Sequence, residues 1–179
     1  MLFKSLAALS VLAATVAADG ASIQAALAAV DKQALTLDSS VKQFDGSSAV
    51  AAFPVLINTL QLQSTIQSGT ATAKNSSALS NDEAIALVAP VQQLAKDTNT
   101  TLTDIINKYQ DFNKNNLAAI VKSNLQSSKQ DSDDFSAAII AKVPQALQST
   151  AQSIAAPIDQ AFANAIAVYS QGSSSSFGF

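Results

Sequence analysis

The sequence predicts an all-α fold, a single-domain bundle of about five amphipathic helices, and three observations support this class. Apolar residues recur at alternating steps of three and four in almost every segment, as they do on one face of a helix. Alanine, the best helix former, is abundant throughout. Clusters of β-branched residues with a period of two, which are typical of strands, are missing. We therefore expect one helical domain over residues 19–171.

The first 18 residues have the pattern of a secretory signal peptide. Lys4 precedes an apolar run from Leu6 to Val16, and the small residues that follow suit cleavage after Ala18. The run is far shorter than the roughly 20 apolar residues that a membrane-spanning helix needs. We therefore expect residues 1–18 to be removed and the mature protein to be secreted.

The first helix is predicted over residues 23–44. Its apolar positions form one continuous stripe on a single face, namely Ile23, Leu27, Val30, Ala34, Leu37, Val41 and Phe44. Gly46 follows the stripe and can adopt the left-handed conformation that commonly closes a helix. The chain should therefore turn at this glycine.

The second helix is predicted from about Val50 to Ser68. Its clearest apolar stripe consists of Phe53, Ile57 and Leu60. We expect Gly69 to end this helix, because residues 69–80 are small, polar and aperiodic, as in a surface loop.

A long third helix is predicted over about residues 81–111. Ser80 and Glu83 fit a capping box, in which each side chain satisfies a free backbone N–H of the first turn. The apolar stripes keep one register past the polar patch at residues 98–101, which favours a single helix. Pro90 should kink it.

The fourth and fifth helices are predicted to meet at Pro144. The fourth should start near residues 113–116 and can run through the polar stretch at 127–134 to Val143, and the pattern leaves open whether it breaks there. The fifth carries apolar residues at helical spacing, namely Leu147, Ala151, Ile154, Ile158, Phe162, Ala165 and Tyr169. Residues 172–179 form a Ser-rich tail that we expect to be disordered.

The chain contains no Cys, His, Arg or Trp, which excludes most catalytic chemistry. Zinc and iron sites lack their usual ligands, and the acidic cluster at 131–134 departs from a calcium loop at Ser136 and Lys142. Serine hydrolysis lacks its usual base and its Gly-x-Ser-x-Gly turn. Ten dispersed cations against thirteen acidic residues argue against a nucleic-acid interface. We therefore expect a binding protein with no catalytic residue, metal or cofactor.

The apolar stripes are the candidate binding surface. Abundant alanine brings helices close together in places, while scattered Phe and Ile leave uneven gaps, and an underfilled core can hold an acyl chain. The candidate lining residues are Phe53, Ile57, Leu60, Ile85, Val88, Leu102, Ile106, Tyr109, Phe112, Phe135, Ile139, Ile154, Ile158 and Phe162. Taken singly, a residue of this kind more often packs in an ordinary hydrophobic core than lines a ligand-binding cavity. Asn75 and Asn99 begin Asn-x-Ser/Thr sequons and are the predicted glycosylation sites.

Three segments together resemble one known family. They are the start of the mature chain, ADGASIQAALAAVDKQALTLDSSVKQFDG, the phrase LINTLQLQSTIQSGTATAK, and the long capped helix after Ser80. They are similar to the fungal hydrophobic surface-binding protein A family, also called cell-wall galactomannoproteins. The resemblance implies a secreted, extracellular or wall-associated helical protein that adsorbs to hydrophobic surfaces and, in some members, encloses fatty acids. In one lineage it implies secreted esterases as partners.

Three functions remain as alternatives at this point. The protein can bind fatty acids or other amphiphiles between its helices, and each buried methylene would contribute roughly 0.8 kcal/mol. It can instead coat hydrophobic solids as an adsorbed adaptor that recruits secreted esterases. It can also be a structural cell-wall mannoprotein without a ligand. A continuous apolar cavity distinguishes the first function from the third.

Overall fold

The computed structural model describes residues 16–171, most of which are helical, and this range contains no strand. In chain order the elements are α1 (Val16–Gln43), the 3-10 turn η1 (Val50–Ala52), α2 (Phe53–Asn75), α3 (Asn81–Ala86), α4 (Val88–Asn107), α5 (Tyr109–Lys114), α6 (Ala118–Ile140) and α7 (Gln145–Gln171). The predicted all-α class is confirmed, while the count of about five helices is close but not exact. The predicted tail at 172–179 and most of the predicted leader at 1–18 lie outside the described residues.

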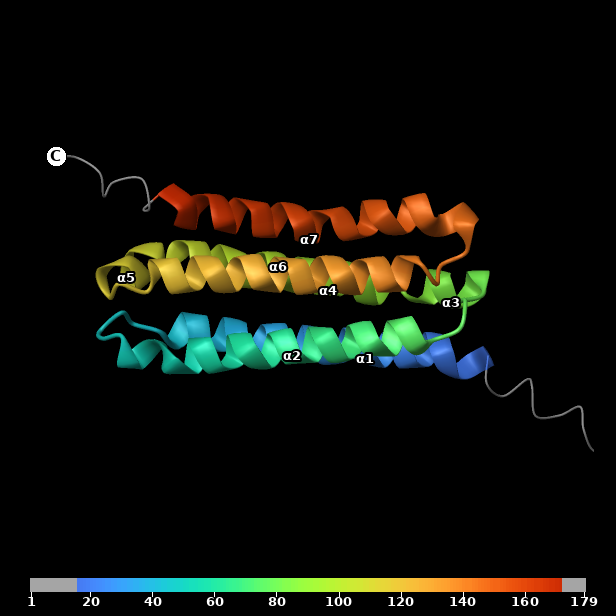
Figure 1. Ribbon diagram of the computed structural model, residues 1–179, viewed down its shortest axis with the longest axis horizontal. Helices are drawn as coiled ribbons and strands as arrows, with labels where there is room; N and C mark the ends of the chain where they lie inside the picture. Colours follow the sequence, from blue (N-terminus) through green and yellow to red (C-terminus); the bar gives the residue numbers. More distant parts are fainter. Residues whose placement is uncertain (1–15, 172–179) are drawn as a thin grey trace, which may run out of the picture.

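The five long helices form a closed ring. Each packs on two neighbours, in the order α1, α2, α6, α7, α4 and back to α1. Figure 1 shows the ring from the side as three layers, with α7 along one side, α4 and α6 in the middle, and α1 and α2 opposite α7. The short helices α3 and α5 lie at opposite ends of the bundle. Because no helix runs along the axis of this five-membered ring, only side chains can fill the space there.

The predicted long helix at 81–111 is divided into α3, α4 and α5. The first break is at Leu87, and the new helix starts at Val88, so Pro90 lies in its first turn. A proline is tolerated there because the N–H that it lacks would have no partner inside the helix. The second break is at Lys108. Pro90 therefore accompanies a restart of the helix rather than a kink within it.

The predicted end of the second helix at Gly69 is wrong, because α2 continues for six more residues to Asn75. Gly69 is buried within the helix, and a Cβ atom built on it would lie 3.0 Å from Cε2 of Phe135. The glycine therefore makes room for an aromatic ring of α6 instead of ending the helix. Much of the predicted loop at 69–80 is consequently helical.

The other predicted signals are present. Ser80 and Glu83 form the complete capping box at the start of α3. Gly46 has a φ of +69° in the turn after α1. The polar stretch at 127–134 lies inside α6 without a break, and Pro144 directly precedes α7. Local start and stop signals thus located the turn after α1, the start of α3 and the start of α7 correctly.

One end of the bundle is closed by aromatic rings. Phe44, after the end of α1, stacks on Phe112 of α5 with ring centroids 4.6 Å apart. Tyr109 of α5 meets Tyr169 of α7 edge to face at 5.1 Å. The hydroxyl of Tyr169 donates to the carbonyl oxygen of Ile105 at 2.7 Å. Burial raises the pKa of Tyr169 above its ordinary range, so this hydroxyl keeps its proton. The α5 end is therefore densely packed, and the hydroxyl of its buried Tyr169 has a hydrogen-bond partner.

Candidate functional site: an apolar cavity on the axis of the bundle

The axis of the ring contains an apolar cavity of about 200 Å³. All five long helices contribute to its wall, and Phe112 of the aromatic end lies at its border. Protein interiors are packed as densely as organic crystals and hold few voids larger than a water molecule, which itself needs only about 10–15 Å³ measured in the same way. The cavity is therefore far larger than an ordinary packing defect.

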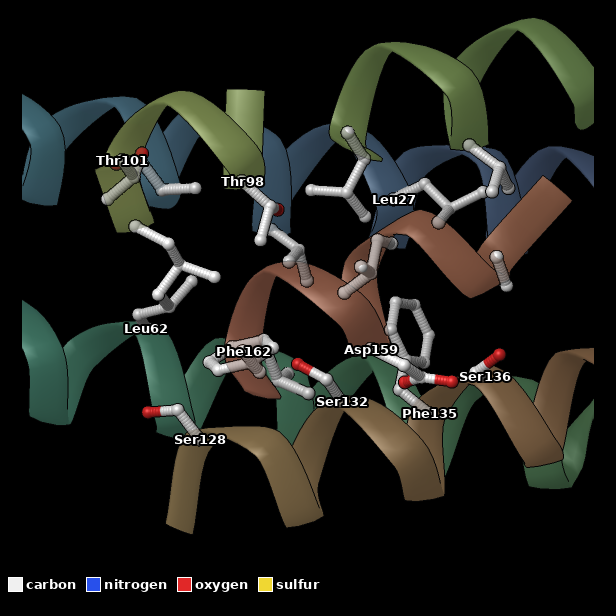
Figure 2. A pocket seen from close by; sticks show the side chains of 18 of the residues that line it. Leu27, Leu62, Thr98, Thr101, Ser128, Ser132, Phe135, Ser136, Asp159 and Phe162 are labelled. Atoms are coloured by element: carbon white, nitrogen blue, oxygen red, sulfur yellow. Dashed lines mark hydrogen bonds between the residues drawn. The ribbon is translucent and has the colours of Figure 1, made fainter. Parts of the chain in front are cut away.

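Small side chains explain why the axis is not filled. On α7 the wall includes Ala151 and Ala155, with branched residues such as Ile154 that are only half-buried. Across the cavity, α6 contributes Ser128, Ser132 and Ser136. Figure 2 shows these serines following one another along α6, with Thr98 and Thr101 of α4 on the other side. Short side chains at these positions leave part of the axis open.

Nine of the predicted lining residues border this cavity. They are Ile85, Val88, Leu102, Phe112, Phe135, Ile139, Ile154, Ile158 and Phe162. Ile85 is 59% exposed and yet lies on the cavity wall, so it stands at an opening near α3. Ile106 and Tyr109 pack partly buried against the core but do not border the cavity.

The predicted inward stripe of α2 faces solvent instead. Phe53, Ile57 and Leu60 are 55%, 55% and 61% exposed and do not line the cavity. The residues of α2 that do line it are Val55, Leu56, Thr59, Leu62 and Ile66. Thr59 is buried because its hydroxyl donates to the carbonyl oxygen of Val55 at 2.8 Å, which satisfies its polar group. The inward face of α2 therefore consists of four aliphatic residues and one threonine, while a second apolar stripe points outward.

Sequence reasoning missed the polar part of the wall. Asn124, Ser128, Ser132 and Ser136 occur at every fourth position of α6, and all four border the cavity. Residues four apart lie above one another on a helix, so the spacing itself places them on one face. The signal was present in the sequence, but the candidate lining residues were chosen among the apolar stripes only.

The seam between α6 and α7 carries charged groups where the cavity approaches the surface. Asp159 lines both the cavity and a shallow recess outside it, together with Ser136 and Ile140. Lys129 binds Asp133 at 2.7 Å and lies 3.8 Å from Asp159. Burial and the neighbouring Asp133 raise the pKa of Asp159, although Lys129 acts in the opposite direction. This rim therefore carries two carboxylates and one ammonium group.

The seam between α1 and α4 pairs carboxylates across the two helices. Partial burial raises the pKa of Asp31, and the adjacent Asp97 of α4 raises it further. One heptad later, burial raises the pKa of Asp38 despite the ion pair with Lys42 at 2.6 Å. Lys42 also lies 3.3 Å from Asp104. None of these charged groups borders the cavity.

The two predicted sequon asparagines are both exposed. Asn75 is the last residue of α2, and Asn99 lies on the outer face of α4. Their glycosylation stays a prediction. Within residues 16–171, no helix is long and apolar enough to cross a membrane.

The described residues thus form an all-α ring of five long helices around an apolar cavity. The family model for hydrophobic surface binding protein A matches residues 20–141. The chain belongs to this family, which confirms the resemblance seen in the sequence.

Two fungal relatives are similar over most of this chain. Cell wall mannoprotein 1 of Aspergillus fumigatus is 34% identical over 146 residues, which cover 82% of this chain and 50% of the relative. Cell wall mannoprotein 1 of Aspergillus flavus is 34% identical over 139 residues, covering 78% and 50%. The chain thus spans about half the length of the curated relatives that it matches.

Solved structures share the fold. The crystal structure of Afmp4p in complex with palmitic acid has a TM-score of 0.80 at 28% identity, covering 84% of this chain and 99% of that one. Ligand binding domain 1 of the Penicillium marneffei MP1 protein, complexed with arachidonic acids, has a TM-score of 0.80 at 20% identity, covering 84% and 98%. At that identity the second likeness concerns the fold alone.

Proposed function

We propose that this protein binds long-chain fatty acids or similar amphiphiles in the cavity between its helices. The observation that carries the proposal is the cavity itself, which is apolar, about 200 Å³ in volume and bordered by all five long helices. A structural mannoprotein without a ligand would have no reason to leave its axis unfilled, since each void costs stability.

The energetics of the cavity favour an acyl chain. Removing a methylene group from water contributes roughly 0.8 kcal/mol, so a chain of a dozen carbons gains substantial affinity without any strong polar contact. The hydrophobic side chains that predominate in the wall offer such contacts along the whole axis of the ring. The palmitic acid bound to Afmp4p, which shares this fold at 28% identity, supports the same ligand class here.

Native mass spectrometry of the secreted protein tests this proposal. We expect co-purified lipid, and we expect its removal to lower the Tm. A ligand that binds only the folded state stabilises it by about 2.7 kcal/mol at 100 times its Kd. The absence of bound lipid, together with no fatty-acid affinity at high micromolar concentration, would contradict the proposal.

A second candidate function rests on a different surface. Phe53, Ile57 and Leu60 lie on the outer face of α2, next to the exposed Val50 of η1. An exposed apolar stripe of this kind suits adsorption to a hydrophobic solid. We propose this adsorption as a second activity of the chain, and secreted esterases as partners of the adsorbed protein stay a prediction.

Adsorption can be tested separately from lipid binding. The double variant Phe53→Ser and Leu60→Ser should bind hydrophobic beads less than wild type while retaining its lipid. A matched pair of serines at the exposed Ala25 and Ala28 of α1 serves as the control. Equal adsorption of all three proteins would assign no role to the α2 stripe.

The relatives also bear on where the protein acts. Both curated relatives are cell wall mannoproteins. Together with the leader predicted at residues 1–18, this supports a secreted, extracellular or wall-associated protein with glycans at Asn75 and Asn99. Deglycosylation of the secreted protein, followed by mass measurement, would show whether each sequon is occupied.

A further inference from the structure

The polar groups of the cavity wall are almost all uncharged. They are hydroxyl and amide side chains of α2, α4, α6 and α7, and no lysine among residues 16–171 borders the cavity. The one charged lining residue is an acid, Asp159. A carboxylate anion entering this cavity would therefore lose water without meeting a cation, which is costly in an apolar environment.

Three serines of α6 form a ladder of hydroxyl groups along the cavity. Ser128, Ser132 and Ser136 are four residues apart, so successive hydroxyls are separated by about 6 Å along the helix axis. Figure 2 shows all three on the side of α6 that faces the cavity. The ladder offers polar contacts at several depths, from the wall near Leu62 to the rim near Asp159.

These hydroxyls differ from most others in the molecule in having no partner for their protons. Helical Ser and Thr residues here usually donate to the carbonyl oxygen four residues earlier, as Thr59 and Thr101 do. Within the described range, the hydroxyls of Ser132 and Ser136 make no hydrogen bond, and the hydroxyl of Ser128 only accepts one, from Gln63 at 3.2 Å. Three donors are thus left for a ligand.

The charge at the rim acts against anions as well. Asp159 faces Lys129 and Asp133 of α6, and Lys129 is held by Asp133 at 2.7 Å. The residues of α4 that line the cavity opposite α7, such as Val88, Val91 and Thr98, carry no charge. The rim therefore has one more negative than positive charge when both carboxyls are ionised, and its only ammonium group is already paired.

We propose that the cavity selects amphiphiles with an uncharged head group, such as an alcohol, an ester or a protonated carboxylic acid, and binds that group through the serine ladder of α6. This inference rests on the proposed lipid-binding function and adds head-group selection to it. A hydroxyl or carbonyl oxygen accepts from a serine at the cost of no buried charge. A fatty acid would accordingly bind as the neutral acid.

Dodecanol and dodecanoic acid have the same chain length, so a difference between their affinities reports the effect of the head group alone. Their affinities can be measured by displacement of the uncharged dye Nile red from delipidated protein at pH 5.5 and pH 7.5. For a carboxylic acid with an ordinary pKa of about 4.3, the neutral fraction falls about tenfold for each pH unit above that value. We expect the Kd of dodecanoic acid to rise at least tenfold between the two pH values and that of dodecanol to change less than twofold.

Substitutions locate the head-group contacts. Ser132→Ala and Ser136→Ala should each weaken dodecanol about fivefold, because one hydrogen bond to the ligand is lost. Ser127→Ala, on the exposed face of the same helix, is the control and should have no effect. Asp159→Lys should lower the ratio of the dodecanoate Kd to the dodecanol Kd at pH 7.5 at least tenfold, since it places a cation at the rim.

The outcomes separate this inference from the function on which it rests. If neither compound displaces the dye at either pH, lipid binding itself fails. If dodecanoate at pH 7.5 binds as tightly as dodecanol, lipid binding stands and head-group selection is overturned. A parallel loss of both ligands at higher pH would also overturn it, because the protein and not the ligand would then be titrating.

Discussion

The two halves of α7 carry the same apolar pattern but pack differently. In the second half, Ala161, Phe162, Ala165 and Tyr169 are all buried. In the first half, residues 145–159, no residue reaches that level of burial, and the apolar residues that line the cavity are half-buried. A helical period therefore shows which face of a helix is apolar, but not whether that face meets side chains or a space for a ligand.

The difference comes from the neighbours of each half. The second half meets the aromatic rings of Phe112 and Tyr109, whose bulk reaches the axis of the ring. The first half faces short side chains, among them Val88 of α4 and Ser136 of α6. Pro157 lies near the end of the first half, within a helix that remains continuous. One helix thus serves as core at one end and as a cavity wall at the other.

The largest effect should come from removing an aromatic ring at the packed end. Phe44→Ala deletes a side chain that is 2% exposed and stacked on Phe112, and we expect a loss of about 3–5 kcal/mol in the free energy of unfolding. Urea denaturation measures it. The exposed Phe53→Ala is the control and should stay within about 0.5 kcal/mol of wild type. Similar losses in both variants would contradict the view that the α5 end is the packed part of the core.

The comparison is most direct when one substitution is made in both halves of α7. Ala165→Leu adds volume to a site that is 0% exposed, and overpacking should cost about 1–3 kcal/mol. Ala151→Leu adds the same atoms where the cavity can take them, so stability should stay within about 1 kcal/mol of wild type or rise. The second variant should also bind lipid more weakly. Equal destabilisation by both changes would mean that the cavity is closed in solution.

A smaller loss is expected from one hydroxyl at the packed end. Tyr169→Phe removes the 2.7 Å hydrogen bond to the carbonyl oxygen of Ile105 and leaves the ring in place. We expect a cost of about 1 kcal/mol, measured by urea denaturation, and no change in lipid affinity, since Tyr169 does not border the cavity. A change in lipid affinity would show that the two ends are coupled.

The smallest effect concerns charge beside the cavity and depends on pH. Because burial and Asp97 raise the pKa of Asp31, the folded chain keeps this proton over an interval above 3.8 in which the unfolded chain has lost it. Stability therefore falls as the pH rises through that interval. Asp31→Asn cannot ionise and should raise the Tm at pH 7 but not at pH 3.5. An equal gain at both pH values would point to a cause other than ionisation.

Sequence signals that depend only on residues nearby in the chain predicted the fold well. The capping box at Ser80, the turn at Gly46 and the stop at Pro144 each act within one or two turns of backbone, so the sequence suffices to locate them. Gly69 was misinterpreted because its role depends on a ring that approaches from α6, far away in the sequence.

The candidate site was predicted less completely, for a related reason. α2 carries apolar residues on both faces, and the face that points inward includes Thr59, whose hydroxyl is satisfied within the helix, while Leu60 stays outside. Periodicity alone therefore did not determine which of the two apolar stripes points inward. The volume of a cavity is the small difference between the space inside the ring and the volume of the side chains that enter it. All five helices contribute to both quantities, so the sequence of one helix does not determine the difference.

The order of the helices in the ring has a consequence for the time at which a ligand can enter. The last described helix, α7, lies between α4 and α6 and completes the ring. Since a ribosome releases α7 after the other four long helices, these can assemble first as a trough that is open along its full length. A hydrocarbon chain that settles into the trough at this stage needs no passage between packed helices, and the docking of α7 then encloses it. A lipid present at the moment of synthesis would thus be enclosed before any exchange through the opening at Ile85 begins.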